Sequence, residues 1–119
     1  MKIVNITKNT LLADQARTAD TFLMRLIGLL NRKSLTEGEA LILQPSNCIH
    51  SLFMRFSIDV LFLDKSGKVV AALPVFKPFR LSPLYWHSTS VIELPEATIR
   101  LTNTQPGDTI QITPVISFS

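Results

Sequence analysis

Apolar and polar residues alternate in short runs along most of this chain, which is typical of strands. Lys2 to Thr7 alternates in this way and is rich in β-branched residues, so it is predicted to form a half-buried first strand, with Leu11 to Ala13 as its hairpin partner. Further strands are predicted at Glu39 to Leu43, Val69 to Leu73, Ser90 to Leu94 and Thr109 to Ile116.

One run is apolar at nearly every position and ends at a turn signal, Ser66-Gly67. This run, Ile58 to Asp64, is predicted to form a strand buried on both faces and to pair with Val69 to Leu73 as an antiparallel hairpin. Alternation places Ile58, Val60 and Phe62 on one face, and Asp59, Leu61 and Leu63 on the other.

Helical spacing is found in one substantial segment. Thr18 or Asp20 is suited to cap a helix, and Phe22, Leu26 and Leu30 follow as part of an apolar stripe. Thr98 to Leu101 is predicted to form one helical turn. Recurring prolines predict irregular structure from Pro74 to Pro83. Taken together, the predicted elements contain more strand than helix.

These elements predict an α+β fold that is mostly β. The expected architecture is a curled antiparallel sheet or small barrel, covered on one side by the helix. A length of 119 residues suits one hydrophobic core, so residues 1–119 are expected to form a single domain.

Charge and cysteine content narrow the classes of partner. The net charge of +3 comes from twelve basic and nine acidic residues spread along the chain, so there is no strong nucleic-acid signal, and nucleic-acid binding is the third and least favoured function. Cys48 is the single cysteine, which excludes an internal disulfide, and we expect it to be a small buried hydrophobe. With neither a signal peptide nor a spanning apolar segment in the sequence, we expect a soluble cytoplasmic protein without a membrane partner.

The candidate chemistry lies around the buried strand, where polar residues stand among large apolar ones. Asp59 falls on an apolar face, and a buried carboxylate needs a partner because an unpaired charge costs several kcal/mol in low dielectric. His50 and Arg55 are its nearest candidate partners in sequence. This group is interpreted either as a working site or as a structural ion pair.

The first functional hypothesis is a small ligand-binding or interaction domain, with an unknown small molecule or protein as partner. Its polar groups would lie in an apolar pocket, partly covered by the loop from Phe76 to His87. That loop holds aromatic and basic residues, which suits a stacking platform, a sugar-binding loop or a loop pinned by its own aromatics. The expected ligand-binding residues are His50, Phe53, Arg55, Asp59 and Trp86.

The alternative is a small hydrolase or lyase in which His50 acts as general base and Asp59 orients it. Arg25 or Arg55 would hold an anionic group, and Glu93 completes the set of catalytic candidates. This hypothesis requires that His50 be accessible to solvent.

No metal site or cofactor is predicted. Two histidines without a Cys-x-x-Cys or His-x-x-x-His pattern do not suit zinc. A magnesium or calcium site built from Asp59, Asp64 and Glu93 is the remaining alternative. Asp64 has a simpler role, since it opens the Asp-Lys-Ser-Gly turn, where its side chain can hydrogen-bond the backbone two residues on.

Several motifs, in order along nearly the whole chain, resemble the family catalogued as domain of unknown function 192. They are Arg25-Leu-Ile-Gly28-Leu, Ala40 to Leu43, Ile49-His50 to Met54, Ile58 to Asp64, Gly67, Val91 to Pro95 and Gly107-Asp108. The resemblance implies a compact β-rich domain and no reaction. In that family an Ala-Gly pair is commoner where this chain has Glu96-Ala97, so a loop that needs a positive φ angle would have lost its glycine.

Overall fold

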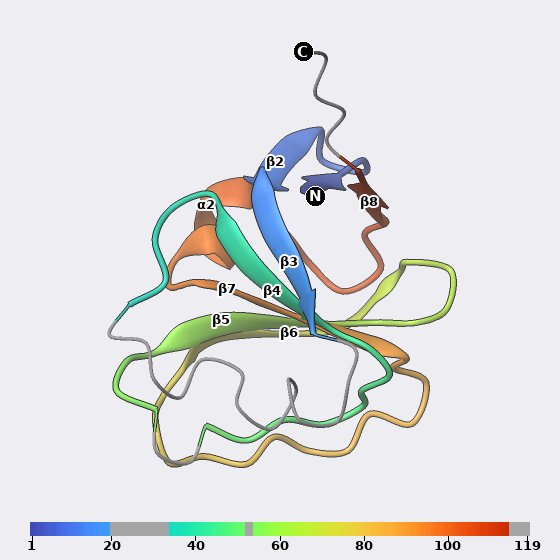
Figure 1. Ribbon diagram of the computed structural model, residues 1–119. Helices are drawn as coiled ribbons and strands as arrows, with labels where there is room; N and C mark the ends of the chain where they lie inside the picture. The colour runs from blue at the N-terminus through green and yellow to red at the C-terminus, as the bar shows by residue number, and fades with distance from the viewer. Residues whose placement is uncertain (20–33, 52–53, 115–119) are drawn as a thin grey trace.

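Two β-sheets make up the fold. The computed structural model describes residues 1–19, 34–51 and 54–114 (Figure 1). The small sheet has the order β2-β1-β8, and its strands are β1 (Lys2–Asn5), β2 (Thr10–Ala13) and β8 (Ile110–Thr113). The large sheet has the order β3-β4-β7-β5-β6, and its strands are β3 (Gln15–Ala19), β4 (Glu39–Leu43), β7 (Ser90–Pro95), β5 (Ile58–Leu63) and β6 (Val69–Phe76). Neighbours are antiparallel except β3 and β4, which are parallel.

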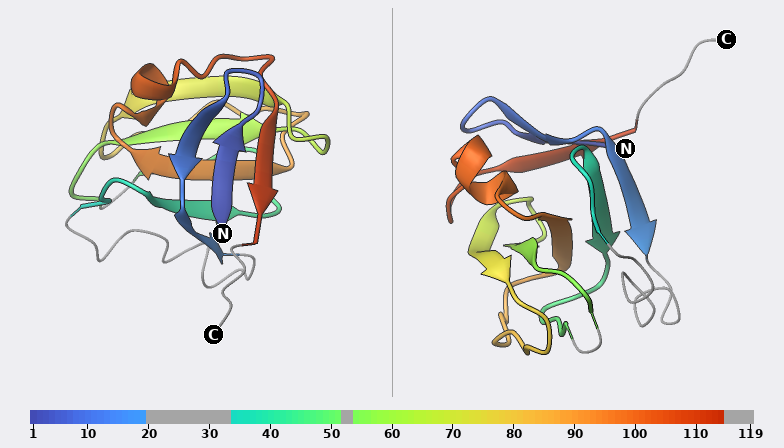
Figure 2. Two further views of the ribbon diagram at one scale, coloured as in Figure 1. Left: turned by 90° about the horizontal axis from the view of Figure 1, so that it is seen from above. Right: turned by 90° about the vertical axis from the view of Figure 1, so that its left-hand side faces the viewer.

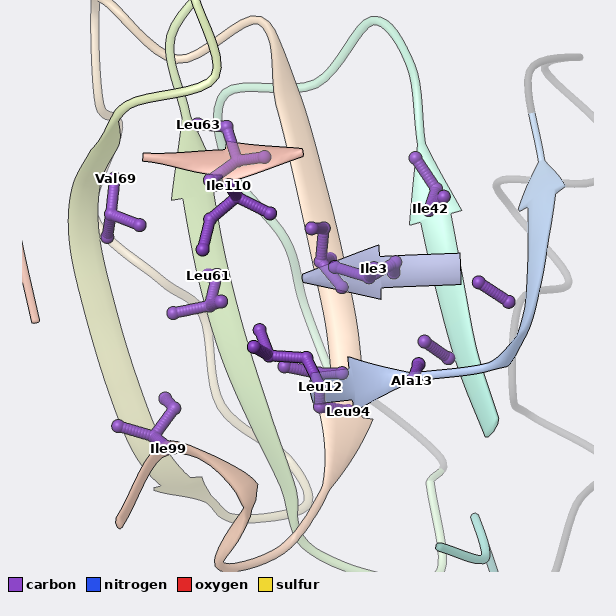
Figure 3. Close-up of a cluster of buried hydrophobic side chains, with 13 residues drawn as sticks. Ile3, Leu12, Ala13, Ile42, Leu61, Leu63, Val69, Leu94, Ile99 and Ile110 are labelled. Atoms are coloured by element: carbon purple, nitrogen blue, oxygen red, sulfur yellow. The ribbon is translucent and has the colours of Figure 1, made fainter. Parts of the chain in front are cut away.

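The main core lies between the two sheets, whose strands cross steeply when viewed from above (Figure 2). Ile3 and Leu12 of the small sheet face Leu61, Leu94 and neighbouring side chains of the large sheet (Figure 3). Burying an aliphatic side chain of this size contributes about 1.5–3 kcal/mol. This interface therefore holds the sheets together without a continuous ladder of hydrogen bonds.

Strand β5 lies inside the large sheet, between β7 and β6, and all six of its residues are buried. The predicted alternation is confirmed: Leu61 and Leu63 belong to the core between the sheets, whereas Val60 and Phe62 belong to a second apolar cluster on the opposite face. We call that opposite face the outer face of the large sheet.

The β5–β6 turn is also as predicted. The Asp64 carboxylate accepts hydrogen bonds from Ser66 N at 2.9 Å and Lys68 N at 3.0 Å. The hydrogen bond from the Ser66 hydroxyl, followed by the one from the Lys68 amide, lowers the pKa of Asp64. Gly67 has φ +88°, and a Cβ there would lie 2.7 Å from the carbonyl oxygen of Ile110, so the turn requires glycine.

Two long connections cover part of the outer face with their described residues, 44–51 and 54–57 of the first and 77–89 of the second, and we call these residues the double loop. They run along the lower edge of Figure 1, on the side of the large sheet away from the small sheet. Ile49 and Met54 of the first connection pack in the outer cluster. Tyr85 of the second lies against Phe62, with ring centroids 4.4 Å apart. The interpretation of the aromatic loop as pinned to the sheet therefore holds for Tyr85.

The β-rich class is confirmed, but the barrel alternative is wrong, because the two sheets are not closed on each other. Strands β2 and β3 are separated only by Asp14, yet they belong to different sheets, so the chain turns a corner there. Thr18 lies within β3 and caps no helix. Asp20 and the predicted helix at Phe22 to Leu30 lie outside the described residues.

The predicted helical turn is confirmed as α2 (Thr98–Thr102), which lies at one end of the large sheet (Figure 1). Among the described residues, no helix has the length and apolarity needed to cross a membrane. Cys48 is exposed, so its predicted burial is wrong: the residue lies in the irregular connection after β4 and not in a buried strand.

Candidate functional site

Glu93 is the unusual polar group of the outer face. It lies in the middle of β7, opposite Leu41 of β4 on one side and Val60 of β5 on the other. Only 5% of the residue is exposed, and its Oε2 has no hydrogen-bond partner in the described structure. Native proteins seldom leave a buried polar atom unpaired, so this carboxyl group calls for an explanation.

Burial raises the pKa of Glu93 from its ordinary value of 4.5 to about 7. The physical cause is desolvation: apolar neighbours stabilise the charged form far less than water does. Near neutral pH the group therefore exists in both protonation states. The neutral acid can donate a hydrogen bond and the carboxylate can accept one, so the same side chain can recognise either kind of group or move a proton between them.

An open cavity of about 370 Å³ lies beside the outer face, where β6 meets the double loop. Leu73, one of its lining residues, is opposite Val60, which is itself opposite Glu93, so the three residues form one row across the sheet. Two strand spacings separate Glu93 from Leu73, roughly 10 Å. Lys77 and Arg80 add positive charge to this otherwise largely apolar cavity.

The two halves of the double loop are joined by hydrogen bonds that backbone amides donate, with Ser51 at their centre. Ser51 is fully buried, its carbonyl oxygen accepts from Phe79 N at 2.9 Å, and its hydroxyl oxygen accepts from Arg80 N at 2.9 Å. Ile49 and Ser82 exchange a further pair of bonds, each 2.9 Å long. Ser51 therefore holds the wall of the cavity in place, which is a structural role.

Asp59 belongs to the other face of the sheet. It lies opposite Leu94, toward the core between the sheets, while Glu93 points to the outer cluster. Its carboxylate accepts from Val75 N at 3.0 Å and from Ile99 N at 2.8 Å. The expected partnership with His50 or Arg55 is therefore wrong, because backbone amides of β6 and α2 satisfy this buried carboxylate.

The remaining predicted site residues are divided between the double loop and the undescribed parts of the chain. His50 is exposed, as the catalytic hypothesis required, and forms a β-bridge with Leu81. Arg55 and Trp86 are also exposed on the double loop. Arg25 and Phe53 lie outside the described residues.

The three carboxylates considered for a divalent cation are not brought together. Asp59 and Glu93 lie on opposite faces of the sheet, and Asp64 is in the β5–β6 turn. In residues 1–19, 34–51 and 54–114, no group of three or more His, Cys, Asp or Glu side chains is placed to hold a metal ion.

A buried polar network at the small sheet had no clear signal in the sequence. Asn5 Nδ2 donates to Asp108 Oδ2 at 2.9 Å, and Lys8 Nζ lies 3.0 Å from the same oxygen. Burial alone would raise the pKa of Asp108, but hydrogen bonds from Asn5, Lys8 and the Gln105 amide outweigh it and lower the pKa. The network ties β1 to the loop before β8, which gives Asp108 of the Gly-Asp motif a structural role.

Known proteins resemble this chain over most of its length. The family model DUF192, described as "Uncharacterized ACR, COG1430", matches residues 3–112. A UPF0127 protein of Pyrococcus furiosus is 33% identical over 112 residues, covering 92% of this chain and 96% of the relative. A UPF0127 protein of Thermococcus kodakarensis is 34% identical over 116 residues, covering 94% of this chain and 73% of the relative.

A solved structure shows the same fold. It is a protein of unknown function from Novosphingobium aromaticivorans, with a TM-score of 0.80, 17% sequence identity and coverage of 93% of this chain and 82% of that one. At this level of identity, the similarity supports the two-sheet architecture and carries no information about a ligand.

Proposed function

Because this chain belongs to the DUF192 family, which is described as uncharacterised, we propose its function from the site itself: a small ligand-binding domain. The ligand lies against the outer face of the large sheet, under or beside the double loop. The observation that carries this proposal is the buried Oε2 of Glu93, which lacks a hydrogen-bond partner in the described structure. A ligand that supplies the missing partner offsets the cost of burying this group.

The chemistry of the site limits the class of ligand. Oε2 of Glu93 favours a hydroxyl, amide or ammonium group, each of which donates a hydrogen bond. The neighbouring Leu41 and Val60 favour an apolar body. The proposed ligand is therefore a small molecule with an apolar part and at least one hydrogen-bond donor.

Four of the ligand contacts expected from the sequence remain part of the proposal: His50, Phe53, Arg55 and Trp86. Asp59 is no longer included, because its oxygens bond to Val75 N and Ile99 N. A small molecule is preferred to a protein partner for this site because Glu93 is buried. The proposed location is the cytoplasm, which cell fractionation would check.

A second candidate function is acid–base catalysis, which one observation favours. A general acid or base works best when its pKa lies near the operating pH, and burial brings the pKa of Glu93 to about 7. Glu93 is therefore proposed as the general acid or base, the role that the catalytic hypothesis gave to His50, and Asp59 no longer has an orienting role because its oxygens bond to Val75 N and Ile99 N. Turnover of a stabilising ligand that is lost in Glu93→Gln would favour catalysis, whereas binding without turnover would favour the binding domain.

The test is a thermal-shift screen of the wild type with sugars, nucleotides, amino acids, polyamines and divalent metals with a chelator control. Glu93→Gln is measured alongside, together with Glu96→Gln, which makes the same chemical change at an exposed position. A ligand present at one hundred times its dissociation constant stabilises the folded state by about 2.7 kcal/mol.

We expect a ligand that raises the midpoint of the wild type and of Glu96→Gln, but raises that of Glu93→Gln much less. A compound that stabilises all three proteins equally binds elsewhere and contradicts the proposed site. A screen in which no compound shifts the wild type also counts against the proposal.

A further inference from the structure

In the part of the chain that the structure describes, most large exposed apolar side chains lie on or beside one half of the double loop. Trp86 is 80% exposed, Leu81 74%, Phe79 60% and Leu84 44%. Together with Val75 just before the loop, they make up five of the eight large hydrophobic residues that are exposed in the described part of the chain. Isolated exposed hydrophobics are common, but a cluster of this kind indicates an interaction surface.

The packing of the loop explains why these side chains point outward. Tyr85 lies inward against Phe62, while its two neighbours, Leu84 and Trp86, are exposed. The hydrogen bonds around Ser51 hold the backbone of Phe79 and Arg80 in place. The apolar side chains are therefore presented by a fixed backbone, which lowers the entropic cost of docking.

The charge of the double loop has a single sign. Residues 44–57 and 77–89 contain no Asp or Glu, and they contribute Arg55, Lys77 and Arg80, all exposed. Exposed acidic residues of the described chain are found elsewhere, for example Glu37 and Glu96 beside α2. The surface is thus both apolar and cationic, which complements a partner that is apolar and anionic.

We propose that the double loop attaches this protein to an anionic lipid surface. Trp86, Phe79 and Leu81 enter the interfacial region of the bilayer, where an indole ring places its apolar body among acyl chains and its N–H among polar groups. Arg55, Lys77 and Arg80 contact the anionic headgroups. The expectation of no membrane partner rested on the lack of a spanning segment, and attachment to a bilayer surface needs none.

Two other anionic partners fit this surface less well. A single-stranded nucleic acid stacks its bases on aromatic rings, but Leu81 and Leu84 offer no such platform. A second copy of this chain meeting the same face would bring like charges together. The lipid surface uses all of the exposed residues, leucines and cations alike.

Trp86 is the chain's one tryptophan, so its fluorescence reports directly on this surface. The full chain is titrated with vesicles of phosphatidylcholine alone and with vesicles that also contain phosphatidylglycerol. We expect a blue shift of the emission with the anionic vesicles only, and salt should weaken it because screening reduces the attraction.

Two matched pairs of variants distinguish binding through this surface from nonspecific adsorption of the protein to vesicles. Leu81→Ser and Arg80→Gln should each bind anionic vesicles roughly tenfold more weakly. Leu101→Ser and Arg100→Gln change the same residue types on α2, where Leu101 is 73% exposed, and should bind like the wild type. Far-UV circular dichroism verifies that each variant is folded.

The proposal is overturned by any of three results. They are an emission that does not respond to anionic vesicles, a loss of binding that is equal in the Leu81 and Leu101 variants, and a response to single-stranded oligonucleotides or acidic peptides in place of vesicles. Arg55 and Trp86 belong to both proposals, but the two tests are independent, because the ligand screen contains no vesicles and is scored on Glu93→Gln, which is not one of the lipid-surface variants.

Discussion

Glu93 and Asp59 are both carboxylates buried in apolar strands of the large sheet, but they have different surroundings. Each oxygen of Asp59 accepts a backbone N–H, whereas one oxygen of Glu93 lacks a partner in the described structure. A carboxylate satisfied by amides stabilises its own fold, while an unsatisfied one costs stability. We therefore assign a structural role to Asp59 and propose a functional role for Glu93.

Ala97 provides a prediction at the scale of one residue. It has φ +79°, in the left-handed region that costs a residue with a Cβ roughly 1–2 kcal/mol. We expect Ala97→Gly to raise the free energy of unfolding by about 1 kcal/mol. Chemical denaturation measures this change directly.

The control is Ala72→Gly within β6, where the same substitution is expected to lower stability because glycine weakens a strand. A destabilised Ala97→Gly protein would contradict the account of this loop. The prediction also answers the question raised by the resemblance, since the loop does adopt the positive φ angle that the family's commoner glycine would suit.

Sequence patterns predicted which residues of one strand share a face, but not the register between neighbouring strands. The alternation in β5 placed Asp59 beside Leu61 and Leu63, as observed. Glu93 lies on the opposite face because of the register between β7 and β5. These two strands are far apart in the sequence, so no local sequence pattern predicts their register. The candidate set that joined Asp59 and Glu93 could not have been corrected from sequence.

At the scale of elements, α2 depends on β5. Its N-cap residue, Ala97, makes no side-chain capping bond, and the Asp59 carboxylate accepts the amide of Ile99 in its place. The other oxygen of Asp59 holds Val75 N, beside the irregularity in the β5–β6 pairing. One side chain of β5 therefore fixes both the start of α2 and the end of β6.

Removing this side chain should release both elements. We expect Asp59→Ala to lower the free energy of unfolding by about 3 kcal/mol, because two charge-assisted hydrogen bonds are lost and their amides stay buried. Hydrogen exchange should quicken at the amides of Val75 and Ile99. Asp14→Ala, at an exposed position, is the control and should change stability by less than about 0.5 kcal/mol.

Wild-type stability in Asp59→Ala would contradict this structural role and would reopen the hypothesis that Asp59 serves a site.

Strand β3 was not predicted, which shows a limit of sequence patterns at the scale of elements. Its residues, Gln-Ala-Arg-Thr-Ala, bury alanines that carry little hydrophobic signal, and its pairing with β4 is parallel and therefore non-local. By contrast, the strongly apolar β4 and β5 were predicted with the correct first residue.

At the scale of the whole molecule, different surfaces serve different purposes. The core between the sheets and the network of Asn5 and Asp108 hold the structure together. The outer face of the large sheet carries the proposed ligand site, and the double loop that covers part of it carries the proposed lipid surface. Most of the exposed side chains that carry these two proposals lie on connections between strands, where function is commonly found.

The pH dependence of folding follows from Glu93. In the unfolded chain Glu93 loses its proton near its ordinary pKa of 4.5, and in the folded protein near 7. Between these values the folded state keeps a proton that the unfolded state has released. The contribution of protonated Glu93 to the free energy of unfolding is therefore complete below pH 4.5 and is lost as the pH rises through 7. The loss is on the order of 3 kcal/mol.

The most direct test measures the free energy of unfolding of the wild type and of Glu93→Gln by denaturant titration. Both proteins are measured from pH 4 to pH 8 in steps of about one pH unit. The account predicts that the two proteins are similarly stable at the acid end, and that the wild type is less stable by on the order of 3 kcal/mol at the alkaline end. Glu96→Gln should follow the wild type throughout. Parallel profiles for the wild type and Glu93→Gln would mean that the carboxyl group of Glu93 is already satisfied, and would contradict its assignment as the recognition group of a ligand site.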